Sequence, residues 1–173
     1  LMGIARSSLF LTEEEKLATA YHEAGHALVH YYLDHTDPLH KVTIVPRGRA
    51  LGLALSLPEK DTYSHSVARL KDRIVVCYGG FAAESIVYGE TTTGTAQDLR
   101  QATDIARKMV CEWGMSPKMG AVAYGQEDEP IFLGKEIARH KDYSEETARN
   151  IDASVRSILD EGRDRALSIL TDH

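Results

Sequence analysis

The chain has 173 residues, with 43% hydrophobic residues, 27% charged residues and a formal net charge of −6. This length is typical of one domain with a buried core, and the negative charge argues against non-specific nucleic-acid binding. No apolar run approaches the roughly 18 residues expected of a membrane-spanning helix. Cys77 and Cys111 are the only cysteines, and neither belongs to a C-x-x-C pair, so a cysteine zinc site is not expected.

The N-terminal part of the chain predicts one long helix followed by a short β-ribbon. Thr12 and Glu15 form a T-x-x-E capping box, and apolar residues recur at helical spacing after it. We therefore expect a helix from about Thr12 to Leu33. The β-branched run at residues 41–46 and the segment 51–57 predict two short strands, which suffice for a ribbon but not for a large sheet.

The remainder of the chain predicts helices separated by glycines. The expected elements are a helix over 64–77, a break at Gly79-Gly80, a helix over 81–87, a helix from a Thr95 cap to about Trp113, and a last helix from a Ser144 cap towards Leu170. Residues 115–142 are mixed, and the acidic stretch 127–130 is expected to form an exposed loop. The predicted fold class is mainly α with a small β-ribbon.

The first predicted helix contains the pattern H-E-x-x-H at residues 22–26. Because residues four apart share one face of a helix, His22 and His26 can direct a ring nitrogen at one metal ion. Glu23 lies about 100° round the helix from His22, where it can accept a proton from the attacking water. This arrangement is typical of zinc hydrolases that cleave peptide bonds. The alternative is a helix with two surface histidines and a solvated glutamate, which the helical context disfavours.

A catalytic zinc site usually has three protein ligands, so a third must be found. His30 is excluded, because it lies eight positions after His22, which corresponds to a rise of about 12 Å along a helix. The longer pattern H-E-x-x-H-x-x-G-x-x-H is also excluded, since Val29 and Tyr32 occupy its last two positions.

Two carboxylates remain as candidates for the third ligand. Glu84 lies in an apolar helical segment, where an unpaired carboxylate would be costly. Asp98 lies in the first turn of a predicted helix, where it could instead form a capping box with Thr95. The residues by themselves leave this choice open.

Segments along almost the whole chain resemble the FtsH family of ATP-dependent zinc metalloproteases. Besides residues 22–27, the segments that carry the resemblance are 42–48, 50–52, 57–59, 79–84, 92–94, 98–110, 114–116 and 143–147. Many separated motifs in the family's order make the resemblance highly specific. In this family an aspartate at the position of Asp98 is the third ligand.

The resemblance implies a helical metalloprotease domain with Zn²⁺ held by His22, His26 and Asp98. Glu23 would act as the general base, and Glu84 would support a ligand histidine from outside the ligand set. The implied function is a zinc-dependent endopeptidase. It would hydrolyse unfolded or membrane proteins that an ATPase module of the full-length protein delivers.

The resemblance also implies a homo-hexamer, with a membrane anchor and an ATPase module elsewhere in the full-length protein. The protease domain would face the cytoplasm in bacteria, or an organelle matrix or stroma. Because residues 1–173 contain no G-x-x-x-x-G-K-[ST] pattern, we expect no ATP binding by this chain. We also expect a soluble, isolated protease domain that lacks the family's C-terminal tail.

Two single residues depart from the family's usual pattern. Phe81 replaces an arginine, so any subunit contact or ion pair of that arginine would be lost. Thr95 replaces an alanine and is expected only to strengthen a helix cap.

Alternatives to the endopeptidase remain open. A catalytically inactive zinc-binding oligomerisation module is disfavoured by Glu23, because a structural metal site needs no base. A small-molecule amidohydrolase with a similar site is the weaker alternative. The strand at residues 42–45 could pair with an extended peptide by edge addition, or it could be a simple structural ribbon, and the sequence does not separate these two roles.

Overall fold

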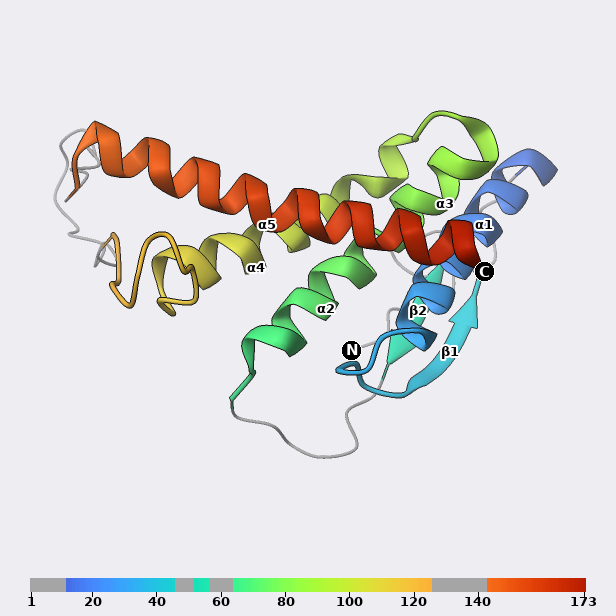
Figure 1. Ribbon diagram of the computed structural model, residues 1–173. Coiled ribbons are helices and arrows are strands. Elements are labelled where there is room, and N and C mark those ends of the chain that lie inside the picture. Colours follow the sequence, from blue (N-terminus) through green and yellow to red (C-terminus); the bar gives the residue numbers. More distant parts are fainter. Residues whose placement is uncertain (1–11, 46–51, 57–63, 126–142) are drawn as a thin grey trace, which may run out of the picture.

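The computed structural model describes residues 12–45, 52–56, 64–125 and 143–173. In chain order these residues form α1 (Glu13–Tyr31), β1 (Leu39–Thr43), β2 (Leu53–Ser56), α2 (Val67–Cys77), α3 (Gly79–Tyr88), the 3-10 turn η1 (Thr93–Thr95), α4 (Ala96–Cys111) and α5 (Glu145–Asp172) (Figure 1). The mainly α class with a small β-ribbon that the sequence predicts is confirmed. The predicted loop at 127–130 lies outside the described residues.

Helix α1 starts at its predicted capping box. The backbone amide of Glu15 donates to Thr12 Oγ1 over 3.1 Å, and the Thr12 amide donates to the Glu15 carboxylate over 2.8 Å. This reciprocal pair satisfies two backbone donors that the first helical turn leaves free. The helix ends at Tyr31, two residues before the predicted end.

The two strands pair antiparallel, with Val42 opposite Ala54. β1 starts two residues before the predicted position and ends at Thr43, and the predicted strand residues 46, 51 and 57 lie outside the described part. Both strands pack against α1, and the backbone of Ala54 in β2 hydrogen-bonds to Glu23 in the middle of that helix. The ribbon therefore lies beside the H-E-x-x-H segment.

Helices α2 and α3 are separated by one residue, Tyr78. The predicted break thus lies one residue earlier than expected, and Gly79 and Gly80 are the first two residues of α3. Their small size serves packing between helices. A Cβ on Gly25 of α1 would meet the Gly79 carbonyl oxygen and lie 2.6 Å from the Ala83 Cβ, so the backbones of α1 and α3 touch.

Thr95 does not cap α4, so the predicted role of this residue is wrong. Its side chain makes no cap hydrogen bond; it is 4% exposed and its hydroxyl donates to the Thr92 carbonyl over 3.0 Å. The capping side chain belongs to Thr92, which accepts from the Gly94 amide at the start of η1. Burial among neighbouring elements has overridden the local preference of Thr95 for a cap.

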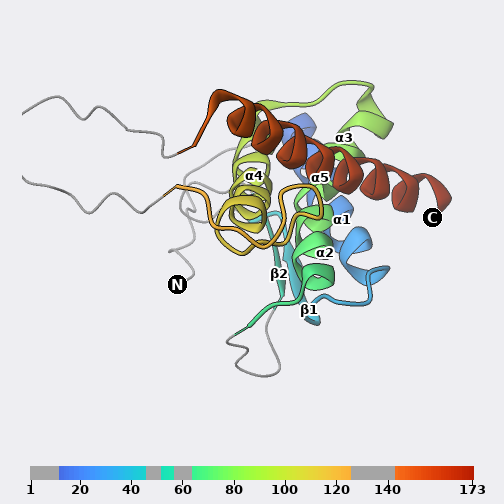
Figure 2. The same ribbon diagram turned by 60° about the vertical axis from the view of Figure 1, so that its left-hand side comes forward.

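The long helix α5 is capped by Ser144 as predicted and runs across the other helices (Figures 1 and 2). It packs against α2, α3 and α4 and closes a core whose fully buried members include Val29, Leu70, Ile74, Met109 and Val110. Within the described ranges, no helix combines the length and the apolar content needed to cross a bilayer.

An ion pair between the buried Asp72 and the exposed Arg165 joins α2 to α5. Asp72 is 2% exposed and accepts hydrogen bonds from the backbone amide and Nδ1 of His35, both at 3.1 Å, and from Arg165 Nη1 at 2.9 Å. A buried carboxylate requires such partners. These contacts hold the segment after α1 against α2 and α5.

Replacing Gly25 with alanine tests the contact between α1 and α3. Glycine to alanine inside a helix usually stabilises by about 1 kcal/mol. Here the added Cβ meets backbone atoms of α3, so we expect Gly25→Ala to destabilise by about 1–3 kcal/mol. Urea unfolding followed by circular dichroism measures the change, and unchanged or increased stability would contradict the close approach.

Candidate metal centre

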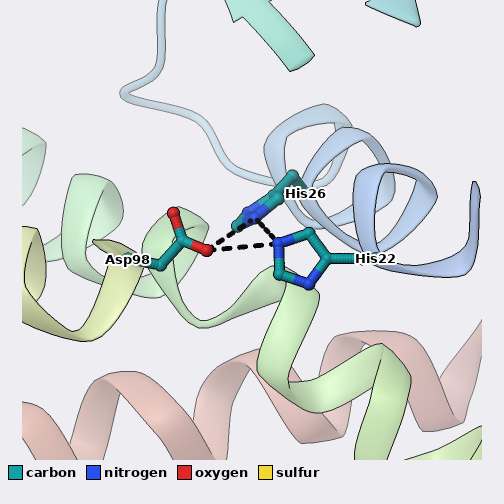
Figure 3. Close-up of side chains that lie close together, drawn as sticks. All are labelled: His22, His26 and Asp98. Carbon is teal, nitrogen blue, oxygen red and sulfur yellow. Dashed lines mark hydrogen bonds and ion pairs between the residues drawn. The ribbon is translucent and has the colours of Figure 1, made fainter. Parts of the chain in front are cut away.

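Three polar atoms from α1 and α4 converge at one point (Figure 3). His22 and His26 lie one turn apart on α1, and Asp98 lies in the first turn of α4. The distance between the two histidine Nε2 atoms is 3.1 Å, and Asp98 Oδ2 is 3.2 Å from His22 Nε2 and 3.3 Å from His26 Nε2. The structure thus brings together three of the residues that the sequence analysis singled out, across 76 positions of the chain.

The other nitrogen of each imidazole determines what these three atoms can do. His26 Nδ1 is 2.7 Å from the Val76 carbonyl oxygen, and His22 Nδ1 is 2.8 Å from Glu84 Oε1. Because a carbonyl and a carboxylate can only accept, both Nδ1 atoms donate. In neutral imidazoles each Nε2 then carries a lone pair. Two nitrogen lone pairs and a carboxylate oxygen therefore face one another, an arrangement that requires a cation between them.

The spacing of the three atoms fits zinc. Ligand atoms that lie about 2.0–2.1 Å from a tetrahedral zinc ion are about 3.3 Å apart, and the observed separations are 3.1, 3.2 and 3.3 Å. Two imidazoles and one carboxylate also match the donor types that zinc takes in catalytic sites. Such sites keep the fourth position free of protein ligands.

The pKa values of His22 and Asp98 indicate that the cluster favours a positive charge between its three atoms. Burial by itself would raise the pKa of Asp98, but contacts with His22 and His26 outweigh it and lower that pKa to about 2. Asp98 is therefore a carboxylate, the form that binds metals, at neutral pH. Burial opposes protonation of His22, but Asp98 and Glu84 outweigh it and raise the pKa of His22. Without a metal, the converging lone pairs thus attract a proton.

Glu23 lies beside the cluster, enclosed between α1 and β2. It is 8% exposed, and burial raises its pKa, although His26 and His22 act in the opposite direction. The Ala54 backbone amide hydrogen-bonds to it. A Cβ on Gly52 would lie 2.6 Å from the Glu23 Cγ, so a larger residue at that position would displace the Glu23 side chain. A carboxylate with a raised pKa next to a metal site is suited to accept a proton near neutral pH.

Glu84 lies on the outer side of the His22 ring. It contacts Nδ1, and its carboxylate is not one of the three converging atoms. The side chain is 3% exposed but fully paired, because the Thr92 amide donates to its Oε2 over 2.6 Å and the Thr92 hydroxyl to its Oε1 over 3.3 Å. These contacts remove the cost of burying a carboxylate in an apolar segment.

Sequence reasoning missed four residues that shape this centre: Gly52, Val76, Gly80 and Thr92. A Cβ on Gly80 would lie 2.5 Å from His22 Nδ1, so this glycine makes room for the ligand ring. Gly79-Gly80 is visible in the sequence, but this pair predicts a break in the helix and not room for a ligand ring. Val76 acts through its backbone carbonyl, for which the side chain gives no signal.

The structure also shows the surroundings of His30 and Cys77, which the sequence analysis excluded as metal ligands. His30 is buried and bonds to the Asp37 carbonyl oxygen. Burial raises the pKa of the Cys77 thiol to about 12, so Cys77 is a packing residue without thiolate character.

Two histidines four residues apart on a helix, a carboxylate ligand and a glutamate beside them form the arrangement of metal-dependent hydrolases. Comparison with known proteins agrees: the model of peptidase family M41 matches residues 9–173. The chain belongs to this family.

Several curated relatives bear the name ATP-dependent zinc metalloprotease FtsH. The chain is 53% identical to the one from Borreliella burgdorferi over 100% of its length, 52% identical to that of Magnetococcus marinus over 99%, and 51% identical to that of Acidobacterium capsulatum over 100%. It covers 27%, 26% and 27% of these proteins, so the chain spans about a quarter of the length of the curated relatives that it matches.

Two substitutions separate a ligand from a supporting carboxylate. Asp98→Asn should lower zinc affinity and hydrolysis together, whereas Glu84→Gln should lower activity by about 10–100-fold with a smaller loss of metal. Zinc titration of both variants measures this, with Asp152→Asn on the exposed face of α5 as the matched control. Loss of zinc in Glu84→Gln with retention in Asp98→Asn would reverse the assignment.

Proposed function

We propose that this chain is a zinc-dependent endopeptidase domain that hydrolyses peptide bonds of unfolded polypeptides. The observation that carries the proposal is the convergence of His22 Nε2, His26 Nε2 and Asp98 Oδ2 within 3.3 Å of one another beside Glu23. Membership of peptidase family M41 and the zinc metalloprotease names of the relatives support it.

In this proposal His22, His26 and Asp98 hold the zinc ion. When bound there, zinc would supply Lewis acidity that activates a water molecule and polarises the scissile carbonyl. Glu23 accepts the proton of the attacking water and returns it to the leaving amine. Val76 and Glu84 keep the two imidazoles in the tautomer that leaves Nε2 free to bind.

An extended substrate would enter along β2. Edge addition was expected at residues 42–45, but the strand whose backbone faces Glu23 contains Ala54, the partner of Val42 in the ribbon. A peptide paired with β2 would have its backbone beside the general base. This proposal therefore assigns peptide pairing to β2 and a supporting role to β1.

For the full-length protein we propose an ATPase module that delivers unfolded or membrane proteins to this domain, a membrane anchor, and a homo-hexameric ring. The protease domain would then lie on the cytoplasmic side in bacteria. Support comes from the names of the relatives, which describe ATP-dependent proteases, and from the share of those proteins that this chain leaves uncovered.

The decisive experiment measures zinc content and casein hydrolysis of the purified chain before and after chelation. Hydrolysis that requires about one zinc per chain and returns when zinc is added back would support the proposal. Bound zinc without any hydrolysis would favour the alternative, a catalytically inactive zinc-binding oligomerisation module. Hydrolysis of small amides but not of casein would favour a small-molecule amidohydrolase.

Replacing the proposed base should separate metal binding from turnover. Glu23→Gln keeps the shape of the side chain and removes its ability to take a proton, so zinc should remain bound while kcat falls by about 10²–10⁴-fold. Metal analysis and peptide hydrolysis measure both properties. Glu14→Gln, an exposed position on the same helix, is the control. Turnover close to that of the parent would remove Glu23 from the mechanism.

The proposed substrate class predicts a dependence on the folded state of the substrate. A peptide bond must be extended to pair with β2, so unfolded polypeptides should be cleaved and tightly folded ones left intact. ATP should not change the rate, because residues 1–173 contain no phosphate-binding loop. Paired digestions of native and unfolded casein-sized substrates, with and without ATP, measure this. Equal degradation of both forms, at a rate that ATP raises, would contradict the prediction.

A further inference from the structure

A groove with a volume of about 400 Å³ runs between α2 and α4, outside the metal centre. Its wall on the α4 side starts at Gln97, the residue before the proposed ligand Asp98, and continues to Trp113 beyond the end of that helix. From Asp98 to Lys108 the helix rises about 15 Å, which an extended peptide covers with about four or five residues. The groove is therefore placed to receive the part of a polypeptide chain that adjoins a bond held at the metal centre.

The groove is positively charged although the whole chain carries a net charge of −6. Three of its lining residues, Arg73, Arg100 and Lys108, are cations, and Asp104 is its one acid. All three cations are exposed, and none forms an ion pair with another described residue. Lys71, which also lies on α2 but outside the groove, pairs with Glu161 over 2.9 Å. Unpaired cations that line one groove offer binding sites for carboxylates.

Two further side chains that line the groove are His65 and Trp113. His65 Nδ1 is buried and has no hydrogen-bond partner among the described residues, and a buried polar atom of this kind usually has one. Trp113 is 44% exposed at the far end of the groove and presents an aromatic surface. A polypeptide in the groove would cover the tryptophan.

We propose that the groove between α2 and α4 binds an acidic segment of the polypeptide substrate within about five residues of the scissile bond. This inference deepens the proposed endopeptidase function and rests on it. Aspartate and glutamate side chains of the substrate pair with Arg73, Arg100 and Lys108. The chain therefore prefers unfolded polypeptides with acidic residues on one side of the cleaved bond.

Trp113 provides a direct readout, because it is the only tryptophan of the chain and lines the groove. The zinc-loaded Glu23→Gln variant serves as the binding partner, so that bound peptide is not cleaved. It is titrated with an unfolded ten-residue peptide carrying glutamate at alternate positions, and with the same peptide carrying glutamine there. We expect the acidic peptide to change the Trp113 emission and to bind at least about threefold more tightly, with an advantage that salt reduces.

Substitutions in the groove test the origin of this preference. Arg100→Gln combined with Lys108→Gln should weaken binding of the acidic peptide by about three- to tenfold, because exposed charge pairs contribute modestly. The advantage over the glutamine peptide should shrink accordingly. Arg156→Gln removes an exposed cation from α5, outside the groove, and should leave both affinities unchanged. Circular dichroism shows whether each variant keeps its helices.

Several outcomes would overturn the inference. These are equal affinity for the two peptides, an equal loss of acidic-peptide affinity in Arg156→Gln, and the same emission change produced by inorganic phosphate. An emission change that follows protein concentration would indicate that a second copy of the chain occupies the groove instead.

Hydrolysis of both peptides by the parent chain tests the underlying function separately. Cleavage of both peptides with equal kcat/KM would overturn the groove inference and leave the endopeptidase intact. Charge-dependent binding without cleavage of either peptide would support the groove and overturn the endopeptidase.

Discussion

The backbones of α1 and α3 touch at Gly25 and Gly79, and the metal centre depends on this contact. Helices usually pack with their axes about 8–10 Å apart, whereas glycines allow the closest approach in that range. Here a Cβ on either glycine would collide with the other helix. The contact sets Gly80 against the His22 ring and leaves the end of α2 where the Val76 carbonyl meets His26. The orientation of both imidazoles therefore follows from how two helices meet.

The second constraint is that two polar groups beside the histidines, among the described residues, are engaged by contacts other than the three converging atoms. Glu84 is held by His22 and Thr92, and the Val76 carbonyl by His26. Thr92 also caps the turn that leads into α4, so one residue anchors both the support of His22 and the start of the helix that carries Asp98. Metal binding would take the place of the proton that the empty cluster attracts, and it would stabilise the fold.

The parts of this molecule that local rules govern could be predicted from the sequence. The capping box of α1, the shared face of His22 and His26 and the two short strands depend on neighbours within a few residues. The choice between Asp98 and Glu84 could not be made from the residues, because it depends on which side of His22 each carboxylate reaches after folding. The pair Gly79-Gly80 predicts a break, because glycine weakens a helix locally. Tertiary packing instead requires both glycines inside α3.

The distribution of charge matters more for this protein than its net value. At physiological ionic strength the field of an exposed charge fades over about 8 Å, so distant acids on an overall negative chain act weakly on a substrate at the metal centre. The nearest exposed charge along α4 is Arg100, one of the cations of the groove, which starts one residue before Asp98. A zinc ion bound to Asp98 would offset the charge of this carboxylate, so it would not repel an acidic segment there. A domain with a net charge of −6 can therefore still present a positively charged groove beside its candidate metal centre.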